Sequence, residues 1–454
     1  MYKPNEGMVL LNALRQLKPT LTALDIRFIC TNVKVTIADL LFCCPGLRKL
    51  VFYSLGSFDS VLGNMEILGE SRHKLVDVDF ETRLFDESLV KFLKSFPNIR
   101  KLSLKRGCVP ENLDEVVEYC PNLEIFGYYF SYGETDFREQ SNHQEPYYYN
   151  SSSGGITEIF TRENGYGVPA ANFIRLVRKN ANSLRRLHAN MSMTAEQRLA
   201  GEPFAPQYPD YPNWQYTQLE HLTYYSDIYK ATETVFRQAL EFCTSLKELN
   251  LVDVSDLHKF VDTLITLPQL EAFSLSNIMD ADGGDQALIK LFRAYADSDY
   301  MLPVTATSSS SLPAFQQRKK FNKFTCNYCS DIITDDVLDT LSGLETIKIL
   351  EFSGTWTIPS GSSLQNCLNK MRNQLVEITL RNIDHVDDNT LEILSKMDQL
   401  ETVYMRDLEN ITPSGVTTLV DNAKSLRNIS VLRCPQISKM PLTYIKAKVK
   451  FSRT

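Results

Sequence analysis

Few residues in this sequence are suited to chemistry, and the most suggestive are Cys326 and Cys329 in the segment CNYC. Two thiols at this CxxC spacing can bind zinc or exchange disulfides. A tetrahedral zinc site needs four ligands, and no second pair supplies the other two. The six histidines also lack the spacing of metal ligands. We therefore expect no metal site and interpret both cysteines as structural.

Two pairs of neighbouring carboxylates, Asp335-Asp336 and Asp387-Asp388, are the next candidates, because paired acids can transfer protons. Both pairs stand where a helix is expected to begin, and a carboxylate there stabilises the helix dipole. The sequence contains none of the motifs GxxxxGKS/T, GxSxG, HExxH or GxGxxG. We predict that the chain is not an enzyme and uses no cofactor.

The elements that would position these residues are copies of one repeat, in which apolar residues occupy the first, fourth and sixth places. Ten of the thirteen spacings between successive copies fall between 24 and 28 residues. The fourteen copies begin at Leu21, Leu47, Leu75, Ile99, Leu123, Leu184, Leu219, Leu246, Leu270, Phe321, Ile347, Leu375, Leu400 and Leu426.

This pattern predicts a short strand in every copy, with its apolar residues in a shared core and the residues between them facing out. Before most copies lies a helical stretch such as ENLDEVVEYC, residues 111–120, with apolar residues on one face. A single strand and helix cannot bury that face alone, so neighbouring repeats must stack. We predict an α/β solenoid, a horseshoe with a parallel inner sheet and outer helices.

Cysteines recur at two places in the repeat. One stands three residues before the leading leucine, at Cys44, Cys120 and Cys243, and another follows the strand, at Cys30, Cys108, Cys329 and Cys434. This resembles the cysteine-containing leucine-rich repeats of F-box proteins, over roughly residues 7 to 440. The resemblance implies substrate recognition for an SCF-type ubiquitin ligase, acting in protein ubiquitination and degradation. Cys434 is expected to be a small buried thiol that bonds or packs at the turn.

The start of the chain departs from that family. Residues 8–17 already read as the helix of a repeat, so no F-box fits in this sequence. A Skp-type adaptor and a cullin would be partners if an F-box precedes it. The alternative is a free-standing scaffold or regulatory binder without a ligase link. A third possibility is a small-molecule sensor whose pocket lies over the sheet. At the other end, residues 439–451 are expected to supply a final strand.

Three insertions interrupt what we expect to be a single solenoid over residues 1–454. They lie at about 129–168, 191–217 and 297–320. Insertions in repeat arrays fall in loops, frequently beside the binding surface. The second is the best functional candidate, because Tyr211 and Trp214 stand among prolines and offer rigid contact surface. The alternative for the first and third insertions is disordered padding without a function.

The partner surface is expected on the concave sheet, where outward positions carry tyrosine, histidine and arginine. Such a mixed surface suits a protein better than nucleic acid. From the outward positions we choose Tyr129, His188, Tyr225, Tyr404 and Arg406 as partner-binding residues. For each of them the alternative is a solvated sheet residue.

Composition agrees with a soluble interaction protein. The net charge of −7 gives no general attraction to nucleic acid, and no apolar run reaches the roughly 18 residues of a membrane span. Ten cysteines without a secretion signal predict free thiols in a reducing compartment, so we expect a cytoplasmic or nuclear protein.

Overall fold

The computed structural model contains two compact units, Met1–Gln207 and Tyr208–Thr454, which are described in turn. It describes residues 6–17, 20–28, 35–57, 62–63, 65, 74–83, 86–105, 119–130, 155–163, 168–169, 176–177, 179–192, 218–226, 233–278, 283–296, 301–303, 315–317, 321–329, 331–354, 358, 360–439 and 450–452.

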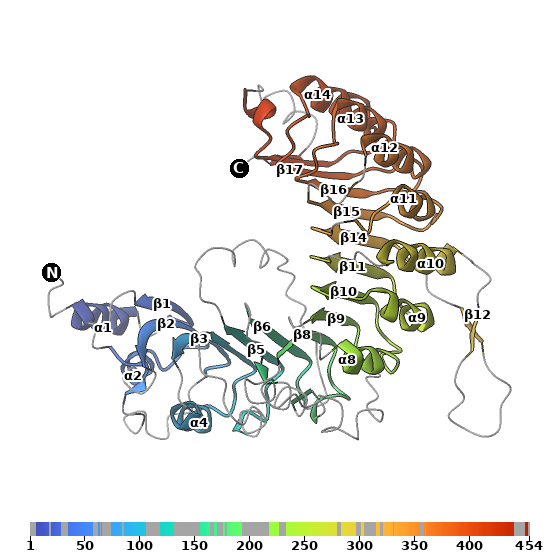
Figure 1. Ribbon diagram of the computed structural model, residues 1–454. Coiled ribbons are helices and arrows are strands. Elements are labelled where there is room, and N and C mark those ends of the chain that lie inside the picture. The colour runs from blue at the N-terminus through green and yellow to red at the C-terminus, as the bar shows by residue number, and fades with distance from the viewer. Residues whose placement is uncertain are drawn as a thin grey trace. The chain divides into compact units, whose positions relative to one another are not determined.

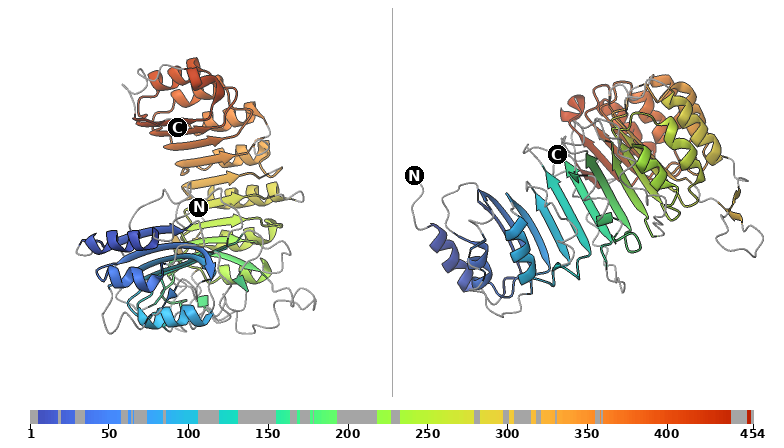
Figure 2. Two further views of the ribbon diagram at one scale, coloured as in Figure 1. Left: turned by 90° about the vertical axis from the view of Figure 1, so that its left-hand side faces the viewer. Right: turned by 60° about the horizontal axis from the view of Figure 1, so that its bottom comes forward.

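The first unit is built on a parallel sheet whose strands pair in chain order (Figures 1 and 2). The strands are β1 (Ala23–Phe28), β2 (Lys49–Ser57), β3 (Asp77–Arg83), β4 (Lys101–Lys105), β5 (Ile125–Phe130), β6 (Glu158–Glu163) and β8 (Arg186–Ser192), with the short β7 (Val168–Pro169) beside β8. Its described helices include α1 (Glu6–Leu17), α2 (Ile37–Cys43) and α4 (Asp86–Ser95). Helix α1 contains the helix predicted at residues 8–17.

The second unit repeats the same plan with greater regularity. Its parallel strands are β9 (His221–Tyr225), β10 (Glu248–Val252), β11 (Ala272–Ser276), β14 (Lys323–Asn327), β15 (Ile349–Ser353), β16 (Glu377–Arg381), β17 (Thr402–Arg406), β18 (Asn428–Leu432) and β19 (Lys450–Ser452). Strand β19 pairs with β18 and confirms the expected final strand.

Helices cover one face of this second sheet (Figure 1). They are α8 (Glu233–Leu240), α9 (His258–Thr266), α10 (Gly284–Ala296), α11 (Asp335–Ser342), α12 (Gly361–Lys370), α13 (Asp388–Ser395) and α14 (Pro413–Asn422), and a 3-10 turn, η4 (Pro435–Lys439), follows β18. Several begin at a residue whose side chain accepts a bond from the first turn, among them Thr334, Ser360, Asp387 and Thr412. Each unit is thus an α/β leucine-rich-repeat solenoid, as the spacing predicted.

The core forms where the apolar positions of successive repeats stack. Leu375, Ile378 and Leu380 of one repeat are fully buried, and so are Leu400 and Val403 of the next. Neighbouring strands pair without slippage, so that Ile378 stands opposite Val403 and Leu380 opposite Met405. Burial of each such side chain contributes about 1.5–3 kcal/mol, and this closes the apolar face that one repeat would leave exposed.

A left-handed residue ends most strands of the second unit. Its N–H donates to the last carbonyl of the next strand; for example, Asp407 N donates to Leu432 O at 3.0 Å. Short polar residues tolerate this conformation, but Tyr328 and Arg433, both at φ 53°, are bulky exceptions. The residues with positive φ after these strands are Asp253, Asn277, Tyr328, Gly354, Asn382, Asp407 and Arg433.

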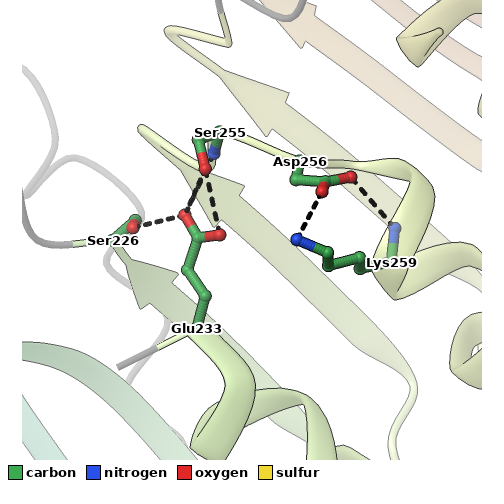
Figure 3. A network of polar contacts seen from close by, with 5 residues as sticks. All are labelled: Ser226, Glu233, Ser255, Asp256 and Lys259. Atoms are coloured by element: carbon green, nitrogen blue, oxygen red, sulfur yellow. Dashed lines mark hydrogen bonds and ion pairs between the residues drawn. The ribbon is translucent and has the colours of Figure 1, made fainter. Parts of the chain in front are cut away.

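Carboxylates at the starts of helices tie one repeat to the next. Glu233, the first residue of α8, accepts bonds from Ser226 Oγ at 2.7 Å, Ser255 N at 3.0 Å and Ser255 Oγ at 3.1–3.2 Å (Figure 3). Beside this network Asp256 contacts the ammonium of Lys259 at 2.7 Å. The network joins the end of β9, helix α8 and the loop after β10.

Carboxylates of the two acidic pairs named in the sequence, Asp335-Asp336 and Asp387-Asp388, also link successive repeats. Asp335 accepts a bond from Ser363 Oγ at 2.5 Å, and Asp388 accepts bonds from Thr412 N and Oγ1. Asp387 caps α13. These carboxylates therefore stabilise helix starts, as expected, and also join successive helices, which no local sequence pattern predicts.

The stretch 129–168, assigned above to an insertion, contains strand β6, which pairs in register with β5 and β8. It went unrecognised because the sixth place of its repeat is Thr161 instead of an apolar residue. Thr161 is nevertheless fully buried, and its hydroxyl donates to His188 O at 3.0 Å. In the third stretch, β12 (Met301–Pro303) and β13 (Phe315–Gln317) form an antiparallel pair.

Candidate protein-binding surface

The candidate site lies on the face of the second unit's sheet opposite its helices, here called the open face. Side chains alternate along every strand, so three positions per strand point to this face while the two between them enter the core. The strand register aligns these positions into columns. The middle column contains Thr223, Asn250, Ser274, Thr325, Glu351, Thr379, Tyr404 and Ser430.

Tyr404 is the most prominent aromatic residue of this column. Its side chain is 42% exposed, whereas the apolar residues on either side of it in β17, Val403 and Met405, are buried. The reason is its neighbours: the register places Thr379 on one side and Ser430 on the other, and both are too small to cover a phenol ring.

Two arginines stand beside this tyrosine in the next column. Arg381 and Arg406 face each other directly across β16 and β17, an arrangement in which like charges repel. Each has an acidic neighbour: Arg381 contacts Glu351 at 3.5 Å, and Arg406 contacts Asp407 at 3.2 Å. We call Tyr404, Arg381 and Arg406 the Tyr404 cluster. An aromatic ring with guanidinium donors beside it is typical of protein interfaces.

Of the residues chosen from the sequence, the structure brings Tyr404 and Arg406 together on β17. Tyr225 lies on β9, the first strand of the second unit, and is half-buried. Arg381 occupied an outward position in the sequence but was not selected, because the sequence alone did not show that it faces Arg406.

The other chosen residues are not part of this cluster. His188 belongs to the first unit, where its ring packs against Phe160 of β6 with centroids 4.7 Å apart. Phe160 was missed because β6 itself was missed. The register pairs Tyr129 of β5 with Lys105 on β4 and with Arg162 on β6, but its side chain lies outside the described residues. Tyr211 and Trp214 also lie outside the described residues.

The cysteines are core residues wherever the structure describes them. Cys326 and Cys329 are no more than 1% exposed, and Cys329 Sγ donates to Asn327 O at 3.3 Å. Burial raises the pKa of Cys326 well above its ordinary value. Cys434 donates to Leu432 O at 3.4 Å, which confirms the bonding predicted for it. Among the described residues no group of three or more side chains could hold a metal ion.

A membrane-spanning helix would need length and apolar character together. Within the ranges that the structure describes, no helix combines the two.

Comparison with models of protein families finds no match for this sequence, and comparison with curated proteins finds none either. Among solved structures, the chain is similar to one in the crystal structure of the Rad7 and Elc1 complex from yeast. The identity is 13%, the TM-score is 0.43, and the match covers 99% of this chain and 92% of that chain. These comparisons assign no family.

Proposed function

We propose that this chain is a non-catalytic protein-binding module that holds a protein partner on the open face of its second unit. The observation that supports this most directly is the Tyr404 cluster, in which small neighbours leave an aromatic ring exposed beside two arginines. Exposed tyrosine and arginine at the centre of a surface supply a large share of binding energy in protein complexes.

The partner class follows from the sequence. Cysteine-containing leucine-rich repeats resemble those of F-box proteins, so we propose that the partner is a substrate delivered to an SCF-type ubiquitin ligase. In that case a Skp-type adaptor and a cullin belong to the same assembly. Buried free thiols at Cys120, Cys243 and Cys434 fit a cytoplasmic or nuclear location, where thiols remain reduced.

Site-specific photo-crosslinking tests the proposal. The photoreactive amino acid p-benzoylphenylalanine replaces Tyr404 in the full chain, and cross-linked proteins from native cell extract are identified by mass spectrometry. The matched control carries the same amino acid at Phe42, an aromatic residue of α2 that is 55% exposed. We expect a discrete cross-linked protein from position 404 that is not obtained from position 42.

A second variant, Arg381→Ala/Arg406→Ala, is expected to reduce this cross-link by tenfold or so, because two charged contacts contribute on the order of 1–2 kcal/mol or more. Recovery of a Skp-type adaptor and a cullin in the same sample supports the ligase link. Recovery of the partner alone supports the free-standing binder. Equal cross-linking from positions 404 and 42 would contradict the proposed surface.

A further inference from the structure

Strand β1 is the end strand of the first unit's described sheet. Among the described strands only β2 pairs with it. The carbonyl of Thr22 accepts from Lys49 N on the β2 side. Backbone groups alternate in direction along a strand, so the N–H and C=O groups of Ala23, Asp25 and Arg27 point away from β2. Such an edge can hydrogen-bond a further strand.

Apolar residues remain partly uncovered at this end. Leu21 and Leu24, the first two core residues of the first repeat, are only half-buried. Their counterparts in the next repeat, Leu47 and Leu50, are no more than 1% exposed. The first repeat therefore lacks the cover that a neighbouring repeat gives to the second.

Helix α1, which lies at the same end of the unit (Figure 1), is apolar on two sides. Leu11 and Leu14 are buried. Val9, Ala13 and Leu17 are exposed, and their four-residue spacing places them in one stripe along the helix. Val9 is 67% exposed and Leu17 is 52% exposed. Apolar residues on two sides are typical of a helix that has a neighbour on each side.

The charges on β1 identify a strand that fits its edge. Asp25 and Arg27 contact each other along the strand at 3.3 Å, and both side chains stay more than half exposed, so each can also meet a charge on a neighbouring strand. A second β1 that runs antiparallel about a two-fold axis at Ile26 places Asp25 opposite Arg27 of the other copy, twice. An axis at Asp25 or at Arg27 would instead set like charges against each other.

We propose that this end of the first unit binds a second copy of the chain and forms a symmetric dimer. The two β1 strands pair antiparallel around Ile26, so that the same surface is used by both copies. The stripe on α1 fits this symmetry, because it is centred on the small Ala13 and brings Val9 against Leu17 of the second copy.

The two parts of this surface have different roles. Burial of the apolar residues on α1 and β1 stabilises the dimer. The charges of Asp25 and Arg27 select the register, since exposed ion pairs add little to stability. The dimer does not involve the Tyr404 cluster, so it does not depend on the function proposed above.

Sedimentation velocity of the full chain tests the proposal. We expect the mass to rise from that of one chain toward that of two between about 1 and 100 µM, as for a small interface. Val9→Glu places a charge in the apolar stripe and should weaken the dimer at least about tenfold. The matched control is Phe42→Glu, at a residue of α2 that is also exposed, and it should leave the dimer unchanged.

Charge reversal tests the register. Asp25→Arg sets arginines opposite each other and Arg27→Asp sets aspartates opposite each other, so each variant alone should dimerise about tenfold more weakly. An equimolar mixture of the two variants should recover the dimer, because every arginine then faces an aspartate. Both variants should keep the Tm of the unmodified chain, since the contact that they remove is exposed.

The mass of a single chain at every concentration of the unmodified protein would overturn the inference. A dimer that Val9→Glu leaves intact would place the interface elsewhere and overturn it as well. A mixture of the two charge variants that stays monomeric would show that the β1 strands do not pair around Ile26.

Discussion

Asp388 and Thr412 join two successive repeats through a pair of hydrogen bonds. The carboxylate of Asp388, at the start of α13, accepts from Thr412 N at 2.8 Å and from Thr412 Oγ1 at 2.6 Å. Thr412 is itself the cap of α14. One carboxylate thus fixes where the next helix begins, and Gly415 provides the room for it: a Cβ at that position would lie 2.1 Å from Asp388 Oδ1.

The first prediction concerns Gly415→Ala. The added methyl group must displace the Asp388 carboxylate from Thr412, so we expect a loss of about 1–3 kcal/mol in the free energy of unfolding. Urea unfolding followed by circular dichroism measures it. In the Asp388→Ala background the same change should cost much less, because the obstructing carboxylate is gone. Additive costs in the double variant would show that the clash does not occur.

The second prediction concerns Glu233, which is 8% exposed and accepts bonds from two serines. Glu233→Ala leaves the Ser226 hydroxyl and the Ser255 N–H and hydroxyl without their acceptor, so we expect destabilisation by about 2–3 kcal/mol. Ser226→Ala removes a single donor and should cost about 1 kcal/mol. Glu392→Ala, at an exposed position of α13, is the control and should change stability by less than about 0.5 kcal/mol. A Glu233 variant as stable as this control would contradict the role given to the network.

The third prediction concerns acid. Burial would raise the pKa of Asp387, but hydrogen bonds from Thr390 and Asn389 outweigh it and hold the pKa below its ordinary value. The stabilisation is therefore fully present above the unfolded pKa of about 3.9 and is lost as the pH falls through the folded value. Asp387→Ala should cost about 1 kcal/mol at pH 7, as loss of a helix cap does, and clearly less near pH 3. Urea titrations at the two pH values check this, with Asp398→Ala as an exposed control. If Asp387→Ala lowered the free energy of unfolding equally at pH 7 and near pH 3, the charge of the carboxylate would be excluded as the source of the stabilisation.

The fourth prediction concerns thiol reactivity. Burial raises the pKa of Cys120, Cys243 and Cys367 to about 12. Only the thiolate is nucleophilic, and about one thiol in ten thousand is ionised at pH 8, so each of these thiols would react slowly even if reagent could reach it. We expect iodoacetamide to leave all three unmodified in the folded chain and to modify them after urea unfolding, as read by peptide mass spectrometry. Rapid labelling of Cys243 without urea would mean that its repeat opens readily.

The repeat could be predicted from the sequence because aliphatic residues at three fixed places leave a signal that recurs fourteen times. Strand β6 could not be predicted because Thr161 replaces the third of these aliphatic residues. The polar Thr161 can be buried because its hydroxyl donates to His188 O. A hydrogen bond to a residue 27 positions away leaves no local pattern, so only the fold could reveal this strand.

The candidate site was predictable in part. Tyr404 and Arg406 follow from alternation within a single strand, and that alternation is written in the sequence. The facing of Arg381 and Arg406 depends on how separate strands align, which no spacing rule within one strand contains.

The uniform register has a consequence for how such a protein can change over time. Ile378 faces Val403 and Thr379 faces Tyr404 without slippage. The strand register therefore fixes the position of each outward residue on the open face. A single substitution at Tyr404 or Ser274 alters one position of the open face and leaves the buried apolar residues of the same strand unchanged. Successive single substitutions on the open face can therefore change which partner the chain binds while the fold stays the same.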